Sequence, residues 1–151
     1  MITFRVDGVP IPQGSKTVAR AGGKVWLRDA NASRLKPWRQ RVAAASDVGE
    51  TFDCPVMVVA VFYLPVPKRP RWFAPAVKPD TDKLCRALLD GMTDGGLLSD
   101  DARVIDLIAL KRYATVENPV GVAVSVVEVK ENWARPDRVQ AVVDRLNSEE
   151  N

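Results

Sequence analysis

Four aspartates flank one short predicted helix at a spacing that could hold a metal ion against a phosphate. Asp80 and Asp82 stand where the helix begins, and Asp100 and Asp101 follow the Gly95-Gly96 pair that ends it. Like charges placed this close destabilise one another unless a cation neutralises them. Carboxylate oxygens are hard ligands that suit Mg²⁺ or Mn²⁺ and leave positions open for water and phosphate. The motif therefore predicts metal-dependent phosphodiester chemistry.

The local geometry limits which of these carboxylates can share an ion. Residues two apart on a regular helix point about 200° apart, so Asp80 and Asp82 must straddle the helix entrance. Pro79 favours extended backbone at the residue before it, which helps to aim both side chains into one space. The glycine pair then returns the chain, and we expect Asp100 or Asp101 to close the site just ahead of the next strand.

Each aspartate also has a simpler structural explanation. Asp80 or Asp82 could cap the helix N-terminus, which is worth about 0.5–2 kcal/mol, and Asp94-Gly95 could be no more than a turn signal. Asp100 and Asp101 could be loop residues that face water. For a single aspartate this explanation is preferred. For the whole set, acids on both sides of a compact helix within basic surroundings favour a metal site.

Two clusters of basic residues precede the acidic motif. The net charge of +3 is only mildly basic, but residues 16–41 are strongly cationic and are opposed by Asp29 alone. The second cluster consists of Lys68, Arg69, Arg71 and Lys78. Trp72 and Phe73 lie among these residues and could stack on bases. Two clusters beside one acidic motif favour a polyanionic partner over solvated loop charges. The residues expected to contact DNA are Lys16, Arg20, Arg34, Arg39, Lys68, Arg69, Arg71 and Lys83.

The composition narrows the class of protein. With 151 residues, 46% hydrophobic and 27% charged, the chain has the size and balance of one soluble globular domain. No apolar run approaches the roughly 20 residues of a membrane helix, and no secretory signal is recognisable, so we expect a cytoplasmic protein. The lack of histidine excludes Ser-His-Asp hydrolysis, and Cys54 and Cys85 are too few for a zinc site.

Hydrophobic periodicity predicts an α+β domain with a mixed sheet and helices packed on one face. The expected strands are 2–9, 55–64, 103–113 and 120–130, with a hairpin over 17–27 and helices over about 31–47, 81–92 and 136–146. The almost continuous apolar run of 55–64 predicts a central strand covered on both faces. The strands 103–113 and 120–130 are expected to pair as an antiparallel hairpin. Pro37 predicts that the first helix starts at Ser33 or Arg34, with Ser33 as its cap.

The central motif resembles that of the RusA family of Holliday-junction resolvases, which are typically encoded by phages and prophages. The family pattern is Asp-x-Asp-Asn-Leu, then a helix, then a Gly and an Asp-Asp pair with a following strand. The matching segments are 79–84, 87–92 and 95–105, and the opening 10–16 is similar to the N-terminal loop of many members. The resemblance spans roughly residues 2–130. It implies a RusA-like nuclease domain over 1–130, with 131–151 as a C-terminal helical extension of the same domain.

The resemblance also implies an activity. It is that of a homodimeric endonuclease that binds four-way DNA junctions and cuts two opposed strands with Mg²⁺ or Mn²⁺, within the bacterial host cell if a phage encodes the chain. By position, the metal-binding catalytic aspartates correspond to Asp80, Asp82 and Asp101, and the family's catalytic lysine corresponds to Arg86. Lys83 stands where the family pattern has Asn. Arg86 retains the positive charge of the family's lysine. Its guanidinium group is planar and does not lose its proton in proteins.

Other functions stay open from the sequence. A non-catalytic junction or duplex binder would keep the basic face and use its acids as caps. A related metal nuclease would act on forks, flaps or single strands. A phage assembly protein has no positive feature of the sequence in its favour.

Overall fold

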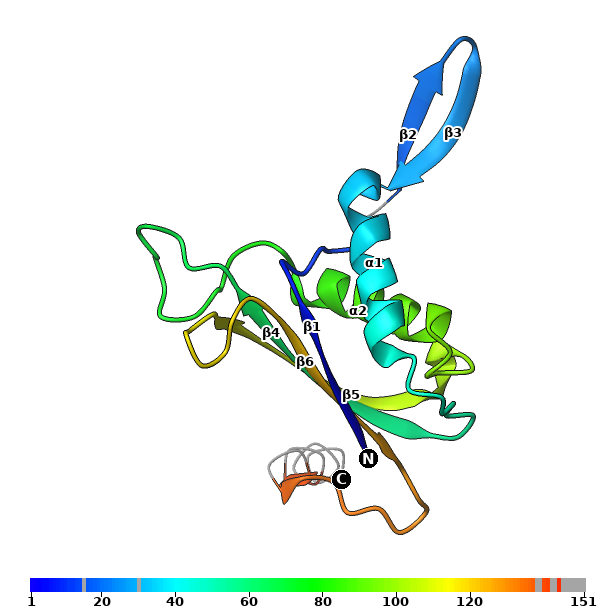
Figure 1. The fold of residues 1–151 in the computed structure, drawn as a ribbon, viewed down its shortest axis with the longest axis vertical. Coiled ribbons are helices and arrows are strands. Elements are labelled where there is room, and N and C mark those ends of the chain that lie inside the picture. Colours follow the sequence, from blue (N-terminus) through cyan, green and yellow to red (C-terminus); the bar gives the residue numbers. More distant parts are fainter. Residues whose placement is uncertain (15, 30, 138–139, 142–143, 145–151) are drawn as a thin grey trace.

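The computed structural model describes residues 1–14, 16–29, 31–137, 140–141 and 144. Within them, a four-stranded sheet carries two helices, and a separate two-stranded hairpin projects beyond the N-terminal end of the first helix (Figure 1). The elements are β1 (Ile2–Asp7), β2 (Lys16–Ala21), β3 (Lys24–Asp29), α1 (Ala32–Ser46), β4 (Val56–Leu64), α2 (Thr81–Asp94), a 3₁₀ turn (Asp101–Arg103), β5 (Val104–Tyr113) and β6 (Gly121–Glu128).

The sheet is mixed and has the strand order β1-β6-β4-β5. β4 runs parallel to β5 and antiparallel to β6, and β1 runs antiparallel to β6. Both helices lie on one face of this sheet (Figure 1). The predicted fold class, an α+β domain with a mixed sheet and helices on one face, is confirmed.

The predicted pairing of the last two strands is wrong. β5 and β6 form no hairpin with each other, because β4 lies between them and pairs with both. The chain therefore crosses over β4 in the short connection 114–120. β5 becomes an edge strand, joined to β4 through the β4–α2–β5 crossover that a parallel pair requires.

Burial along β4 alternates instead of being complete. Val58, Ala60 and Phe62 face the helices and are fully buried, whereas Val59 and Val61 face the other side and are half-buried. The prediction that this strand is covered on both faces is therefore right only for the helix face. The sequence of β4 is almost continuously apolar because the strand is central in the sheet. Side chains on its outer face are partly covered by those of the neighbouring strands.

The first helix begins earlier than the sequence suggested. Asn31 is the N-cap of α1, and its side chain makes no capping hydrogen bond. Ser33 is not the cap but lies inside the helix. Pro37 is also inside, and its missing N–H leaves the carbonyl of Ser33 without the usual helical partner. Ser33 is exposed, so water can satisfy that carbonyl.

The two helices cross closely at two glycines of the second. A side-chain carbon at Gly91 would lie 2.6 Å from a methyl carbon of Val42, and one at Gly95 would overlap the backbone carbonyl of Ala43. Gly95 also ends α2, as predicted, and the following Gly96 has a φ of 80°. The glycines thus let α2 sit tightly against α1, which fixes the helix that carries the acidic motif.

Replacing Gly95 with Ala is expected to lower the free energy of unfolding by about 1–3 kcal/mol, as overpacking does in other cores. The backbone at Gly95 has a φ of −80°, which alanine adopts without strain, so the effect comes from the contact with α1. Urea denaturation of the two proteins measures it. A Gly95→Ala protein as stable as the wild type would show that the helices can separate without loss.

Two further predictions concern the tip of the β2–β3 hairpin and the last helix. The Gly22-Gly23 tip of the β2–β3 hairpin has φ values of 55° and 76°, as the sequence predicted. The last helix, predicted over 136–146, falls largely outside the described residues. Before it, Arg135 forms an ion pair of 3.2 Å with Asp106, which lies on β5.

None of the helices in the described ranges is both long and apolar enough to cross a membrane.

Candidate active site

The crossover topology determines where the acidic residues lie. Because β4 and β5 are parallel, α2 must run back along them, so its start lies near the end of β5 and its end lies near the start of β5. Asp80 precedes α2, and Asp101 precedes β5. The 14 residues of α2 span about 20 Å. Asp80 and Asp101 therefore belong to opposite ends of the helix.

The predicted convergence of three carboxylates within one chain is consequently not found. No group of three or more His, Cys, Asp or Glu side chains in the described part of the protein could hold one metal ion. The glycine pair does turn the chain back, but it returns the chain to the start of the neighbouring strand and not to the helix entrance. Parallel pairing of β4 with β5 enforces this.

Two of the three predicted carboxylates do share a surface. Asp82 and Asp101 line one open groove of about 540 Å³ together with Arg86. Leu107 and Ala109 of β5 form its apolar side. We call it the carboxylate groove; its remaining lining residues are Thr81, Cys85 and Leu89. Its lining thus includes two acids, one from the first turn of α2 and one from the turn before β5, and one fixed cation between them in sequence.

The simple explanation of the aspartates as helix caps holds for only one of them. Asp100 accepts a hydrogen bond of 2.7 Å from the backbone N–H of Ala102 and so caps the 3₁₀ turn. Asp80 occupies the N-cap position of α2, but its side chain makes no capping hydrogen bond. Asp82 is 74% exposed and has an ion pair of 3.5 Å with Lys83. The carboxylates of Asp80 and Asp82 are thus available to a ligand.

One predicted DNA contact also takes part in ion pairs within the protein. The guanidinium of Arg39 on α1 lies 2.6 Å from Asp94 and 3.7 Å from Asp90, both on α2. Its charge is therefore neutralised within the protein, where it ties the two helices together. The spacing of basic residues along α1 could not reveal this, because the acidic partners come from a separate helix.

The other predicted cations occupy three places. Arg20 is exposed on the projecting hairpin, whereas the side chain of Lys16 lies outside the described part. Arg34 and Lys83 line a second groove at the start of the two helices. Lys68, Arg69 and Arg71 are exposed on the long loop between β4 and α2. There the guanidinium of Arg71 stacks 4.9 Å from the ring of Trp72, and Phe73 is 99% exposed.

A cluster beside Asp101 holds its loop. The hydroxyl of Ser99 donates to Asp53 at 2.6 Å, and the guanidinium of Arg103 donates to the same carboxylate oxygen at 2.9 Å. The hydrogen bond from Ser99 and the hydrogen bond and charge of Arg103 lower the pKa of Asp53. The loop from α2 to β5 is thereby attached to the segment before β4.

Replacing Ser99 with Ala is expected to raise the pKa of Asp53 toward its ordinary value, because the largest cause of the lowering is lost. A lowered carboxyl pKa stabilises the folded state above the pKa of the unfolded chain, and this is lost as pH falls through the folded pKa. The Ser99→Ala protein should therefore lose less stability on acidification. A carboxyl NMR titration of Asp53 checks the shift, and an unchanged pKa would contradict the role of Ser99.

A lysine that was not among the predicted site residues holds the entrance of α2. The ammonium group of Lys111 on β5 donates to the carbonyls of Val77 at 2.7 Å and Pro79 at 2.9 Å. Pro79 directly precedes Asp80. The signal was present, because strand alternation places Lys111 on the same side of β5 as the groove residues Leu107 and Ala109.

The donors at this surface fit a hard divalent cation. Mg²⁺ is commonly bound through one or two carboxylates, with water and substrate phosphate as its other ligands, and Asp82 and Asp101 are donors of this kind. The nearby thiol of Cys85 is not a competing ligand. Burial, and then the charge of Asp82, raise its pKa, so the soft thiolate form is disfavoured.

Comparison with known proteins identifies the family of the chain. The family model described as "Endodeoxyribonuclease RusA" matches residues 7–126. A protein of Bacillus subtilis (strain 168) named "Uncharacterized protein YqaN" is 28% identical over 126 residues, which cover 75% of this chain and 88% of that protein. The family match includes both helices, β4, β5, most of β6 and the whole acidic motif, and it begins at the last residue of β1. The chain therefore belongs to the RusA family of endodeoxyribonucleases, whose activity is directed at Holliday junctions.

Proposed function

We propose that this protein is a Mg²⁺- or Mn²⁺-dependent endodeoxyribonuclease that resolves four-way DNA junctions by paired incision as a homodimer. The observation that carries the proposal is the carboxylate groove, which Asp82, Asp101 and Arg86 line, on a chain of the RusA family. Family membership supplies the reaction class. The groove supplies residues whose chemistry suits it.

The groove residues would hold a divalent cation, and the chemistry that such a cation would supply is a lowered pKa of bound water and stabilisation of charge on the scissile phosphate. Asp82 and Asp101 would offer oxygen ligands from the groove. Asp80, two residues before Asp82 at the entrance of α2, would be a further carboxylate at that end of the helix. The guanidinium of Arg86 holds phosphate oxygens through paired N–H donors. It stays charged throughout, so Arg86 orients and neutralises the phosphate and transfers no proton.

The exposed cations hold the arms of the junction through the DNA backbone. Arg20 on the hairpin and the basic residues of the loop between β4 and α2 extend from the sheet in different directions (Figure 1). Contacts to phosphate fix orientation without reading sequence, and they make binding fall steeply with salt. The exposed Trp72 and Phe73 on that loop can stack on unpaired bases.

A homodimer suits this substrate. A four-way junction presents equivalent strands related by approximate two-fold symmetry, and an isologous dimer presents equivalent sites to them. One protomer with one groove could make a single incision, so paired cutting requires two. Light scattering of the purified protein measures this state directly.

The decisive experiment compares a mobile four-way junction, a replication fork, a flap and a linear duplex at one salt concentration. We expect Mg²⁺-dependent, symmetrically paired cuts in the junction and an uncut duplex. Preferred cutting of the fork or flap would instead assign the groove to a related nuclease. Binding of the junction without cleavage in either Mg²⁺ or Mn²⁺ would make the protein a non-catalytic junction binder.

A further inference from the structure

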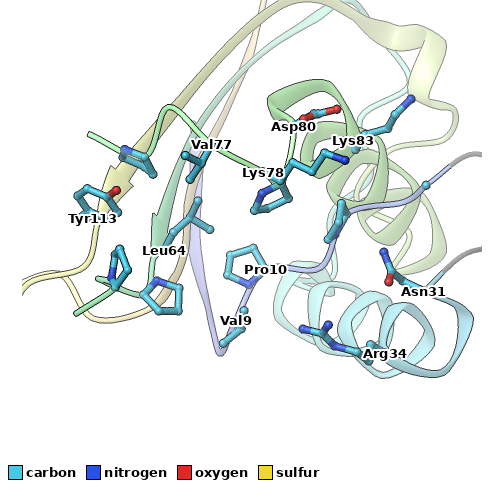
Figure 2. A pocket seen from close by; sticks show the side chains of 16 residues that line it. Val9, Pro10, Asn31, Arg34, Leu64, Val77, Lys78, Asp80, Lys83 and Tyr113 are labelled. Carbon is cyan, nitrogen blue, oxygen red and sulfur yellow. The ribbon is translucent and has the colours of Figure 1, made fainter. Parts of the chain in front are cut away.

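A second groove lies at the other end of α2 from Asp101. It has a volume of about 650 Å³, within the range of about 300–1,000 Å³ of ligand pockets, and is formed where β4 and β5 end and the two helices begin (Figure 2). We call it the proline groove, because six prolines line it: Pro10, Pro12, Pro65, Pro67, Pro75 and Pro79.

The walls of the proline groove are flat and apolar. Tyr113 and Leu64 lie on one side, and Pro10 lies between them and the start of α1 (Figure 2). Rigid rings of this kind lose little conformational freedom when a planar group packs on them. An aromatic ring beside prolines provides a surface on which a base can stack, independently of its sequence.

The rim of the groove is cationic. Arg34, Lys78 and Lys83 line it, against one acid, Asp80. Within the part of the chain that is described, Arg34 and Lys78 have no ion-pair partner. An apolar floor with a positive rim complements a nucleotide, whose base is planar and whose phosphate is anionic. It does not complement a cationic peptide.

A polar group is also available inside the groove. Asn31 lines it, and the side chain of Asn31 is not used to cap α1. A free amide offers both a donor and an acceptor, as the edge of a base requires. Figure 2 shows Asn31 beside Arg34, on the opposite side of the groove from Tyr113.

We infer that the proline groove binds one unstacked nucleotide of the branched DNA, with its base against Tyr113 and the prolines and its phosphate at Lys78 and Arg34. Asp80 lies on the same rim, so this nucleotide is held beside a proposed catalytic carboxylate. The inference rests on the proposed function. Bases at a branch point have already lost part of their stacking, so they are the least costly to extrude.

The test uses a four-way junction with 2-aminopurine at the branch point, whose fluorescence rises when the base is unstacked. The full-length Asp82→Asn protein should bind this junction and raise the fluorescence. Adding Tyr113→Ala should abolish most of the rise and weaken junction binding about tenfold, whereas Tyr113→Phe should preserve both.

The rim is tested separately, since Tyr113→Ala could disturb folding. The association constant of the protein for the junction falls as salt concentration rises. Lys78→Ala should reduce the steepness of this fall, plotted as the logarithm of the constant against the logarithm of salt concentration, by about one. Lys130→Ala is the matched control, because Lys130 is exposed and follows β6 beyond Glu128, which pairs with Val56 at the far end of β4 from the groove. Lys130→Ala should leave the slope and the fluorescence unchanged.

The outcomes separate this inference from the proposed function. If the wild-type protein cuts junctions but its Asp82→Asn form gives no fluorescence rise, nucleotide binding in the proline groove is contradicted. The proposed nuclease function is then unaffected. A rise that survives in folded Tyr113→Ala protein would also overturn it. A protein that neither binds nor cuts junctions would remove both proposals.

Discussion

Replacing Asp82 with Asn is expected to reduce junction cleavage about 10³-fold while the protein still binds the junction. The amide keeps the shape of the side chain but removes the charge that a divalent cation requires, and metal-based stabilisation of the transition state is worth several kcal/mol. The Asp82 side chain is 74% exposed and its ion pair with Lys83 is on the surface, so folding should not change. Single-turnover cleavage and junction binding without divalent cation measure the two effects.

Asp100 provides the matched control for the neighbouring prediction at Asp101. Asp100→Asn should cut nearly as fast as the wild type, because asparagine caps the 3₁₀ turn as aspartate does. Asp101→Asn should resemble Asp82→Asn, since both acids line the carboxylate groove. Loss of cleavage in Asp100→Asn alone, or full cleavage in Asp82→Asn, would contradict the assignment of the metal ligands.

Local patterns in the sequence predicted the elements well because their causes are local. The Gly22-Gly23 pair adopts the positive φ values of a tight hairpin, and the glycines after α2 end that helix. The apolar stripe through Leu84 and Leu88 is fully buried, as a helical period requires. These features depend on a few neighbouring residues and need no knowledge of the rest of the fold.

Strand partners could not be read in the same way. Alternation in β5 and β6 fixes which face each side chain takes, but both an antiparallel hairpin and an arrangement with β4 between them satisfy it. The short connection 114–120 favoured the hairpin. The choice depends on β4, whose apolar side chains are best buried when it is flanked on both edges.

The error over the three carboxylates follows from the same missing information. Once β5 is parallel to β4, the helix between them must separate Asp80 from Asp101, whatever the spacing in the sequence. The ion pairs of Arg39 were missed for a related reason, because its partners Asp90 and Asp94 are distant in sequence. Residue type and spacing identified the reacting groups, but only the topology determines which of them meet.

Lys111→Met is expected to lower the cleavage rate about 10²-fold, the size of effect that a misplacement of about 1 Å can have. Lys111 donates to the carbonyls of Val77 and Pro79, so its loss frees the backbone immediately before Asp80. Both hydrogen bonds come from the one ammonium group, so its removal leaves two carbonyls without this donor, and the free energy of unfolding should fall by about 1–3 kcal/mol. Rates are therefore compared well below the unfolding temperature, with junction affinity measured in parallel.

Arg112→Met is the matched control, because it removes a charge at the next position of β5, where the guanidinium is exposed and donates to the adjacent carbonyl of Lys111. It should cut at close to the wild-type rate. If Lys111 acts by positioning Asp80, Lys111→Met should slow an Asp80→Asn protein hardly at all, since both changes remove the same contribution. Additive losses in the double variant would show instead that Lys111 acts independently of Asp80, through the fold or through the DNA.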